Sequence, residues 1–260
     1  MEITALLLAA GEGTRLRPLT LDWPKCLMPI KGHPLLEYWI SLLGQLNVKS
    51  ILVNTHHKKR IMEEFLNRDR FQGLVNYTYE PKFLGTGGTL LANKDFFQDK
   101  TTLFIHADNW CHCDFQAFID FHVNHRPSNT IMTMMTFQTP TPSSCGIVEL
   151  SNKGIVQKFH EKVKSPPGNL ANAAIYLLEP EVLDIMQNLP NVGDFDIDVM
   201  PRLLGKIATW ENTNIHRDIG TLESLLKAQN DPVPSLDSSN PDDWQRNFEK
   251  NSIHNSLKLN

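Results

Sequence analysis

A glycine-containing segment near the N-terminus carries the residues whose types and spacing predict chemistry. The apolar run at residues 6–10 is followed by Gly11-Glu12-Gly13-Thr14-Arg15, and Lys25 follows shortly after. Because glycine has no Cβ, a Gly-x-Gly turn can bring several backbone N–H groups close to an anion. A guanidinium forms paired hydrogen bonds with phosphate oxygens, whereas an ammonium is a movable point charge. The segment therefore predicts a phosphate-binding turn with Arg15 and Lys25 among its cations.

The wider string around this turn separates it from two common phosphate-binding motifs. It lacks both the P-loop pattern GxxxxGK[ST] and the third glycine of GxGxxG. Instead, Gly11-x-Gly13-Thr14-Arg15-Leu16-x-Pro18 with Pro24-Lys25 resembles the signature of the sugar-1-phosphate nucleotidyltransferases, a resemblance that covers residues 4–229. It implies an enzyme that joins a nucleoside triphosphate to a sugar 1-phosphate and releases pyrophosphate. It also implies Arg15 and Lys25 as catalytic residues and, as nucleotide-binding residues, Ala9, Gly11, Gly13 and Thr14.

A second glycine-rich loop leaves another predicted strand and enters a helix at residues 80–90. Its three glycines allow the backbone to approach a flat ligand such as a base or a ribose. On the glycines alone, a flexible strand-to-helix connection is the competing interpretation. The family resemblance implies that the nucleoside contacts Gly85, Thr86, Gly87 and Gly88.

Two aspartates at distant positions suit a metal ion. Asp108 follows a predicted strand at residues 101–107, and Asp218 stands in an Asp-x-Gly-Thr string. Mg²⁺ prefers hard oxygen ligands and usually retains substrate phosphates in its coordination shell. Taken alone, an aspartate after a strand also suits a helix cap. The resemblance implies Asp108 and Asp218 as ligands of a Mg²⁺ cofactor, with Asp108 also in the nucleotide site.

The second half of the chain predicts a β-hairpin, with strands at residues 144–150 and 154–162. Adjacent residues on a strand point to opposite faces, so an ordinary surface ion pair competes as an interpretation of Glu161-Lys162. The strings Glu161-Lys162 and 172–176 resemble the family's sugar-binding elements, although Ala174 stands where glycine is usual. The resemblance implies that the sugar phosphate is bound by Gly146, Glu161, Lys162 and Asn172.

The elements that would position these residues alternate between strands and helices. Residues 4–10, 50–54, 74–80 and 101–107 have strand patterns, and residues 33–46 and 58–67 have helical spacing of apolar positions. This order predicts an α/β fold with a doubly wound, mostly parallel sheet. The resemblance makes it Rossmann-like, of the GT-A type, with a sugar-binding β-hairpin region. We expect one nucleotidyltransferase domain at residues 1–230 and a polar C-terminal tail at 231–260 with a short helix at 244–248.

Composition excludes several classes of partner. The 260 residues are 41% hydrophobic and have a formal net charge of −4, so the chain lacks the basic footprint of a nucleic-acid-binding protein. It has neither an apolar run long enough to span a membrane nor the pattern of a secretory signal. We therefore expect a cytoplasmic protein with no nucleic-acid or membrane partner, and we keep a homo-oligomer open.

The base and the sugar depend on the resemblance alone. Residues 136–137, 144–150, 166–172 and 216–221 look most like the branch that makes GDP-activated mannose or manno-heptose. Uridylyl, thymidylyl or cytidylyl transfer to another sugar phosphate, or to phosphocholine, stays open. A non-catalytic subunit that senses sugar nucleotides is the alternative from another class, and it predicts missing charges at the reaction centre. The charged residues are all present here.

Overall fold

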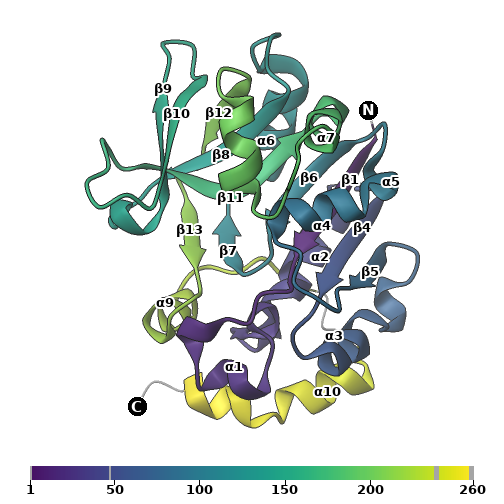
Figure 1. Cartoon of the computed structure of the whole chain (residues 1–260). Coiled ribbons are helices and arrows are strands. Elements are labelled where there is room, and N and C mark those ends of the chain that lie inside the picture. The colour runs from purple at the N-terminus through teal and green to yellow at the C-terminus, as the bar shows by residue number, and fades with distance from the viewer. Residues whose placement is uncertain (1, 47, 237–239, 258–260) are drawn as a thin grey trace. The chain divides into compact units, whose positions relative to one another are not determined.

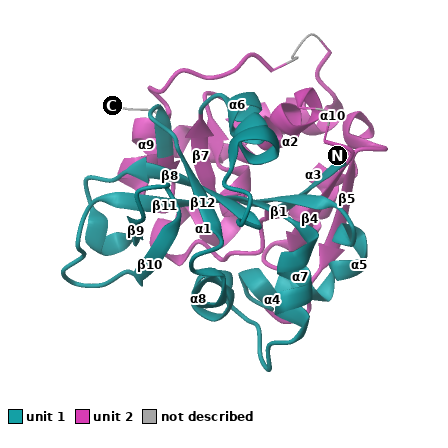
Figure 2. Cartoon of the chain, turned by 90° about the horizontal axis from the view of Figure 1, so that it is seen from above, with its two compact units in different colours: residues 1–6, 84–105, 113–216 teal, residues 7–83, 106–112, 217–260 magenta. Residues whose placement is uncertain are grey.

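The computed structural model describes residues 2–46, 48–236 and 240–257. Contacts divide the chain into two compact units (Figure 2). The first unit comprises residues 1–6, 84–105 and 113–216, and the second comprises residues 7–83, 106–112 and 217–260. Each unit is therefore built from three segments that are distant in the sequence, and we describe each unit separately.

A nine-stranded sheet supplies the framework, and its elements are labelled in Figure 1. The strand order is β10-β9-β11-β6-β1-β4-β5, with β8 paired to β11 and β12 paired to β8. The strands are β1 (Ile3–Leu8), β4 (Ser50–Thr55), β5 (Val75–Tyr79), β6 (Thr101–His106), β8 (Met132–Gln138), β9 (Gly146–Leu150), β10 (Val156–Glu161), β11 (Leu170–Leu178) and β12 (Ile207–Glu211). Two small sheets join β2 (Pro29–Ile30) to β3 (His33–Pro34) and β7 (Asn109–His112) to β13 (Ile215–Asp218).

The second unit has the alternating order that the sequence predicts. Strands β4 and β5 are parallel, with Ile51 opposite Val75 and Thr55 opposite Tyr79. The helix between them, α3 (Lys59–Leu66), buries Met62, Phe65 and Leu66 on one face. Helix α2 (Leu35–Gln45) precedes β4, and α1 (Leu19–Asp22) and α9 (Leu222–Ala228) belong to the same unit. These strands and helices confirm the predicted β-α-β-α-β order.

The first unit is more antiparallel than a doubly wound sheet would require. Strand β11 is antiparallel to β6, β8 and β9, whereas β12 is parallel to β8. Strands β9 and β10 form the predicted hairpin, in which the Ser151 N–H donates to the Ile155 carbonyl oxygen. A connection this short can join only antiparallel neighbours. The helices of this unit are α4 (Thr86–Ala92), α5 (Lys94–Phe97), α6 (Phe115–Asp120), α7 (Pro180–Gln187) and α8 (Met200–Leu203).

The acidic segment at residues 194–198 has an unusual geometry. Asp194 caps this segment, because its side chain accepts the N–H groups of Asp196 and Ile197. The first turn, Phe195–Val199, is a π-helix and continues into α8. The Asp198 side chain accepts the N–H groups of Gly193 and Asp194, so the start of this segment is held at two points.

Residues 240–257 pack within the second unit through apolar side chains. Helix α10 (Asp243–Glu249) contains the helix predicted at residues 244–248, and a 3₁₀ helix follows at Ser252–Leu257. Phe248, Ile253 and Leu257 are buried. Widely spaced apolar residues therefore anchor a segment that composition marks as polar. The division of the chain at residue 230 stays a prediction.

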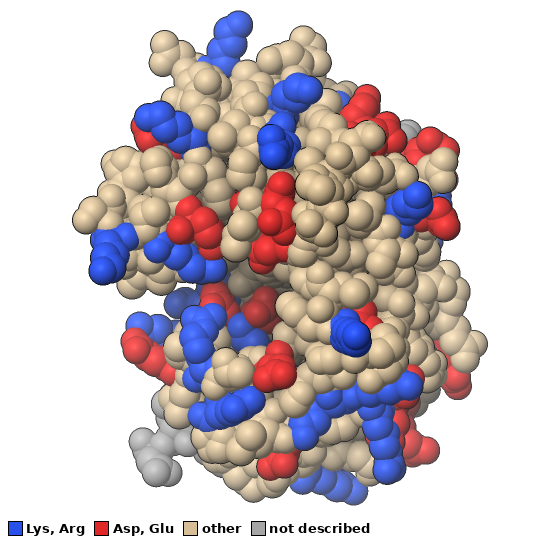
Figure 3. Space-filling view, in the orientation of Figure 1, with Lys and Arg blue, Asp and Glu red and all other residues tan. Residues whose placement is uncertain are grey.

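Charge is mixed over the molecular face drawn in Figure 3, where Lys and Arg side chains are interspersed with Asp and Glu. Among the helices of residues 2–46, 48–236 and 240–257, none is long and apolar enough to cross a bilayer.

Candidate active site

The turn after β1 requires glycine at position 13. Gly13 has φ +63°, in the left-handed region, and a Cβ there would lie 2.9 Å from Thr20 Cγ2 and 3.1 Å from Lys25 Cβ. The Thr20 hydroxyl donates to the Gly13 carbonyl oxygen over 2.9 Å. A 3₁₀ turn at Thr14–Leu16 follows and carries Arg15. The backbone of the turn thus packs directly on the stem of Lys25.

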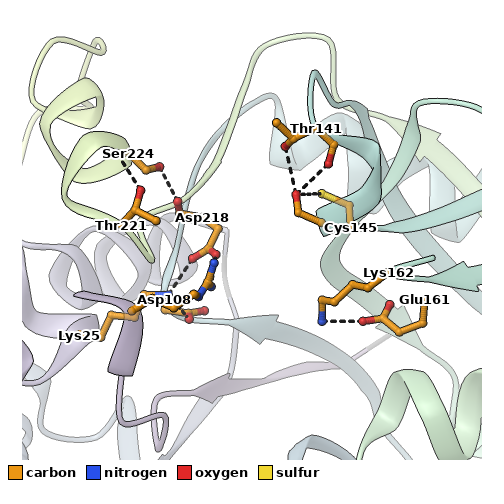
Figure 4. A network of polar contacts seen from close by, with 11 residues as sticks. Lys25, Asp108, Thr141, Cys145, Glu161, Lys162, Asp218, Thr221 and Ser224 are labelled. Carbon is orange, nitrogen blue, oxygen red and sulfur yellow. Dashed lines mark hydrogen bonds and ion pairs between the residues drawn. The ribbon is translucent and has the colours of Figure 1, made fainter. Parts of the chain in front are cut away.

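Four charged side chains in the second unit meet at one point, which we call the cation–carboxylate cluster: Arg15, Lys25, Asp108 and Asp218. Figure 4 labels the last three. Lys25 Nζ donates to Asp108 Oδ2 over 2.6 Å and to Asp218 Oδ1 over 2.7 Å. Arg15 Nη2 donates to Asp218 Oδ2 over 2.6 Å. The Lys25 side chain is 6% exposed, whereas those of Asp108 and Asp218 are 37% and 41% exposed. The structure therefore brings together four predicted residues that are spread over 204 positions of the chain (15 to 218).

The backbone holds the two carboxylates in this position. Asp108 lies just beyond β6, and Asp218 is the last residue of β13. The Ile219 N–H donates to the Asp108 carbonyl oxygen over 3.4 Å. A Cβ on Gly220 would lie 2.6 Å from Arg15 Nη2 and 2.8 Å from Asp218 Oδ2. A side chain at position 220 would thus displace the Arg15–Asp218 ion pair from its present position, which gives a physical reason for the glycine of the Asp-x-Gly-Thr string.

The ion pairs of the cluster favour the charged forms of Arg15, Lys25 and Asp218. Burial alone would lower the pKa of Lys25, but the carboxylates of Asp108 and Asp218 outweigh it and raise the pKa above its ordinary value. Burial alone would raise the pKa of Asp218, but Lys25 and Arg15 outweigh it and lower the pKa. The hydrogen bond to Asp218 raises the pKa of Arg15.

The donor set of the cluster fits a divalent cation. One ammonium lies within hydrogen-bonding distance of both carboxylates, so Asp108 and Asp218 already stand where a single cation can contact both. Mg²⁺ is typically held by one or two protein carboxylates together with waters and substrate phosphates. Among the described residues, no group of three or more His, Cys, Asp or Glu side chains could hold a metal ion. A metal at this point would therefore take its remaining oxygen ligands from water or substrate.

In the first unit, the side chains of Glu161 and Lys162 point toward one another (Figure 4). Lys162 Nζ lies 2.6 Å from Glu161 Oε1. The expected divergence of adjacent side chains does not occur, because β10 ends at Glu161 and Lys162 has φ +48°. Gly146 faces this pair across the hairpin, and a Cβ there would lie 2.7 Å from Glu161 Oε2 and 2.5 Å from Phe159 Cζ.

Asn172 belongs to a half-buried polar group, with Tyr176 and Asp196, that the sequence did not reveal. Its Nδ2 donates to the Tyr176 hydroxyl over 2.6 Å, and that hydroxyl donates to Asp196 Oδ1 over 2.8 Å. Burial raises the pKa of Tyr176 well above its ordinary value. The Asn172 side chain also accepts the N–H of Ala174, which has φ +54°. Asn172 thus supports a left-handed residue at the position where the family usually has glycine.

Ala9 is supported by a second polar chain that sequence reasoning missed. Its N–H donates to Asn54 Oδ1 over 2.7 Å, and Asn54 Nδ2 donates to Glu80 Oε1 over 3.0 Å. All three residues are buried. Each lies at or just beyond the carboxyl end of a strand, β1, β4 or β5, and this shared position is the signal that could have grouped them.

The glycine-rich loop packs against the residues that precede α8. The N–H groups of Gly87 and Gly88 donate to the Gly193 carbonyl oxygen over 2.8 and 2.9 Å. The Thr86 hydroxyl accepts the N–H of Phe195. These glycines therefore permit close packing of two backbones, and the nucleoside contact assigned to Gly85, Thr86, Gly87 and Gly88 stays a prediction.

Gly85→Ala should destabilise the protein more than Gly205→Ala. Both glycines have positive φ, +78° and +82°, so both substitutions strain the backbone. A Cβ at 85 would lie 2.5 Å from the Gly193 carbonyl oxygen, whereas a Cβ at 205 would meet nothing within 4 Å. Measured by urea unfolding, the free energy of unfolding should fall by about 1 kcal/mol for the substitution at position 205 and by about 3 kcal/mol for that at position 85. Equal losses would contradict the packing described for this loop.

Comparison with known proteins gives the chain its family. The sequence model of the nucleotidyl transferase family matches residues 4–233. The chain belongs to the nucleotidyl transferase family. This confirms the family resemblance of the N-terminal turn.

Several relatives of this nucleotidyl transferase have named activities. The mannose-1-phosphate guanyltransferase 2 of Candida glabrata is 29% identical over 245 residues, which are 91% of this chain and 66% of the relative. The mannose-1-phosphate guanylyltransferase of Mycobacterium tuberculosis is 28% identical over 90% of this chain and 66% of its own length. The mannose-1-phosphate guanyltransferase of Saccharomyces cerevisiae is 32% identical over 71% of this chain and 52% of its own length. The chain thus spans less than two thirds of the length of each.

A solved structure supports the fold of this nucleotidyl transferase. A Bacillus anthracis protein, assigned as a glucose-1-phosphate thymidylyltransferase and crystallised with sucrose, has a TM-score of 0.78. The match covers 90% of this chain and 98% of the Bacillus anthracis chain, at 22% sequence identity. The predicted α/β, Rossmann-like class is therefore confirmed.

Proposed function

We propose that this chain transfers a nucleoside monophosphate from a nucleoside triphosphate to a sugar 1-phosphate, releasing pyrophosphate. The observation that supports this proposal most is the cation–carboxylate cluster, which combines two cations for phosphates with two carboxylates for a divalent metal. We propose GTP as the nucleotide and a mannose or manno-heptose 1-phosphate as the acceptor. The mannose-1-phosphate guanylyltransferases among the relatives support this choice.

In the proposed reaction, an oxygen of the sugar phosphate attacks the α-phosphorus of the nucleotide. A new phosphorus–oxygen bond forms, the bond from the α-phosphorus to the β-phosphate oxygen breaks, and pyrophosphate leaves with that electron pair. The attacking phosphate is already ionised, so no general base is required. Catalysis of such transfers depends mainly on positioning and on neutralising charge.

Each residue of the cation–carboxylate cluster has an assigned part in this reaction. An ammonium has three N–H donors. Lys25 uses two of them on Asp108 and Asp218, and we assign the third to an α-phosphate oxygen. We assign Arg15 to the departing pyrophosphate. When bound, Mg²⁺ would be held by Asp108 and Asp218 and would neutralise part of the triphosphate charge.

In the first unit, we assign the sugar phosphate to the hairpin and β11. Glu161 can accept hydrogen bonds from two sugar hydroxyls, and Lys162 can exchange its bond to Glu161 for one to the phosphate. Gly146 leaves the space that Glu161 occupies. We assign a further sugar hydroxyl to Asn172, which Tyr176 holds in place.

Pyrophosphate release by the purified chain with Mg²⁺ tests the proposed reaction. The assay would combine GTP, UTP, dTTP, CTP and ATP with the 1-phosphates of mannose, manno-heptose, glucose and N-acetylglucosamine, and with phosphocholine. We expect release confined to GTP with a manno-configured phosphate. Release with another pair would keep the reaction and overturn the base or sugar assignment. No release by a folded chain that still binds nucleotide would favour the sensing subunit.

We also propose that the protein is cytoplasmic and that it forms a homo-oligomer.

The pH dependence of the reaction should follow the substrate and not the cluster. The pKa of Asp218 is lowered and that of Lys25 is raised, so both stay charged between about pH 5 and pH 9. The second ionisation of a phosphate monoester occurs near pH ~6. We therefore expect kcat/KM to rise through about pH 6 and to stay level to about pH 9. A fall in kcat/KM on raising the pH toward about 9 would contradict this expectation, because it would show that Lys25 or Asp218 titrates in that range.

A further inference from the structure

Aromatic rings of the C-terminal segment, residues 240–257, contact Trp23, which stands two positions before Lys25. The ring of Trp23 lies 5.6 Å from that of Phe248, with 24° between their planes, and 6.3 Å from that of Trp244. Trp244 and Phe248 stack on one another at 5.1 Å. In Figure 1, α10 lies beside α1 and α3, and all these residues belong to the second unit.

Trp23 is joined to the backbone that carries Lys25. Its indole Nε1 donates to the Leu27 carbonyl oxygen over 2.8 Å. Between these residues, Lys25–Leu27 forms a 3₁₀ turn in which the Leu27 N–H donates to the Pro24 carbonyl oxygen. The indole thus joins the chain before this turn to the last residue of the turn, and Lys25 lies between the two points.

Trp244 is itself held from other sides. Its ring lies 4.9 Å from that of the buried Phe65, and the Arg68 guanidinium lies 5.0 Å from it. Arg68 Nε donates to Asp242 over 2.7 Å, and the Arg68 side chain is only 3% exposed. A buried arginine paired with a carboxylate and stacked on an aromatic ring has little freedom to move. The C-terminal segment therefore presents a fixed surface to Trp23.

We infer that Trp244 and Phe248 are positioning residues that hold Lys25 in place through Trp23. The inference rests on the proposed function of Lys25, and it assigns a part in catalysis to a segment beyond residue 233, where the family match ends. Lys25 must reach two carboxylates and a phosphate oxygen from one buried site, and small displacements of such groups are costly.

The kinetic test uses full-length variants. Trp244→Ala should lower kcat by roughly 10- to 100-fold while the KM for the sugar phosphate stays unchanged. Trp244→Phe keeps an aromatic ring and should recover most of the loss. If Trp244 acts through Trp23, the Trp23→Ala/Trp244→Ala double variant should be little slower than Trp23→Ala alone. Val182→Ala in α7 of the first unit removes buried apolar atoms elsewhere and controls for lost stability. Wild-type kcat in Trp244→Ala, or full additivity in the double variant, would overturn the inference.

A second measurement does not depend on turnover. Lys25 is buried and ion-paired, so an amine-acylating reagent should modify it slowly compared with Lys227, which is 59% exposed. Trp244→Ala should raise the acylation rate of Lys25 by about 10-fold, quantified by peptide mass spectrometry against Lys227. Unchanged protection of Lys25 would contradict positioning. If the wild-type chain proves inactive, the proposed function fails, and this measurement still decides whether Trp244 positions Lys25.

Discussion

Lys25→Met should lower kcat for pyrophosphate release by roughly 10³-fold, the largest effect of any single change that we expect. Lys25 bonds to both carboxylates of the cluster from a side chain that is 6% exposed. Methionine fills a similar volume without the charge. The substitution would remove the assigned donor to the α-phosphate and leave Asp108 and Asp218 to repel the triphosphate.

Two further variants separate charge from geometry. Lys25→Arg keeps the charge but introduces a planar guanidinium that cannot place one nitrogen between two carboxylates in the same way, so we expect little recovery. Lys227→Met removes an exposed lysine that pairs with Glu223 in α9, and it should leave kcat unchanged. Circular dichroism and steady-state kinetics on the same preparations provide the comparison. A well-folded Lys25→Met variant with wild-type kcat would refute the part assigned to this residue.

Asp218→Asn should lower kcat by at least about 100-fold and raise the Mg²⁺ concentration needed for half-maximal rate by at least about 10-fold. Asparagine keeps an oxygen that can accept from Arg15 but removes the negative charge that also pairs with Lys25. We expect Asp108→Asn to behave similarly, because Asp108 contacts the same ammonium. A Mg²⁺ titration of the rate at saturating substrates measures both effects.

The matched control for the aspartates is Glu223→Gln. Glu223 is 78% exposed and pairs with Lys227 in the same unit, so loss of its charge should change neither kcat nor the Mg²⁺ dependence. If Asp218→Asn lowered kcat with an unaltered Mg²⁺ titration, Asp218 would act on Arg15 and Lys25 alone. The metal assignment would then be wrong.

The glycine turn and its cations, Arg15 and Lys25, were predicted from local residue types, whereas Asp108 and Asp218 were assigned because of the family resemblance. Arg15 follows the glycine turn after β1, Asp108 follows β6, and Asp218 is the last residue of β13, two positions before Gly220. Strand periodicity and turn chemistry are local signals, so they can be found without knowledge of packing. Strands β1, β4, β5 and β6, helices α2 and α3, and the β9–β10 hairpin were predicted from such local signals.

Other parts of the site depend on contacts that no local pattern encodes. Lys162 turns toward Glu161 because its φ is positive, which is uncommon for a lysine. Asp196 meets Tyr176 across 20 residues, and Trp244 meets Trp23 across more than 200. Composition marked the last 30 residues as a polar tail because few apolar side chains suffice to anchor it. Only tertiary packing reveals these partners.

The most direct test of the account follows the phosphate oxygens through the reaction. Mannose 1-phosphate labelled with heavy oxygen at its non-bridging phosphate positions would be incubated with unlabelled GTP, Mg²⁺ and the chain, and the products would be weighed by mass spectrometry. Attack by the sugar phosphate on the α-phosphorus predicts that all of the label appears in GDP-mannose and none in pyrophosphate. Label in the released phosphates, or a diphosphate of mannose formed together with GDP, would contradict it.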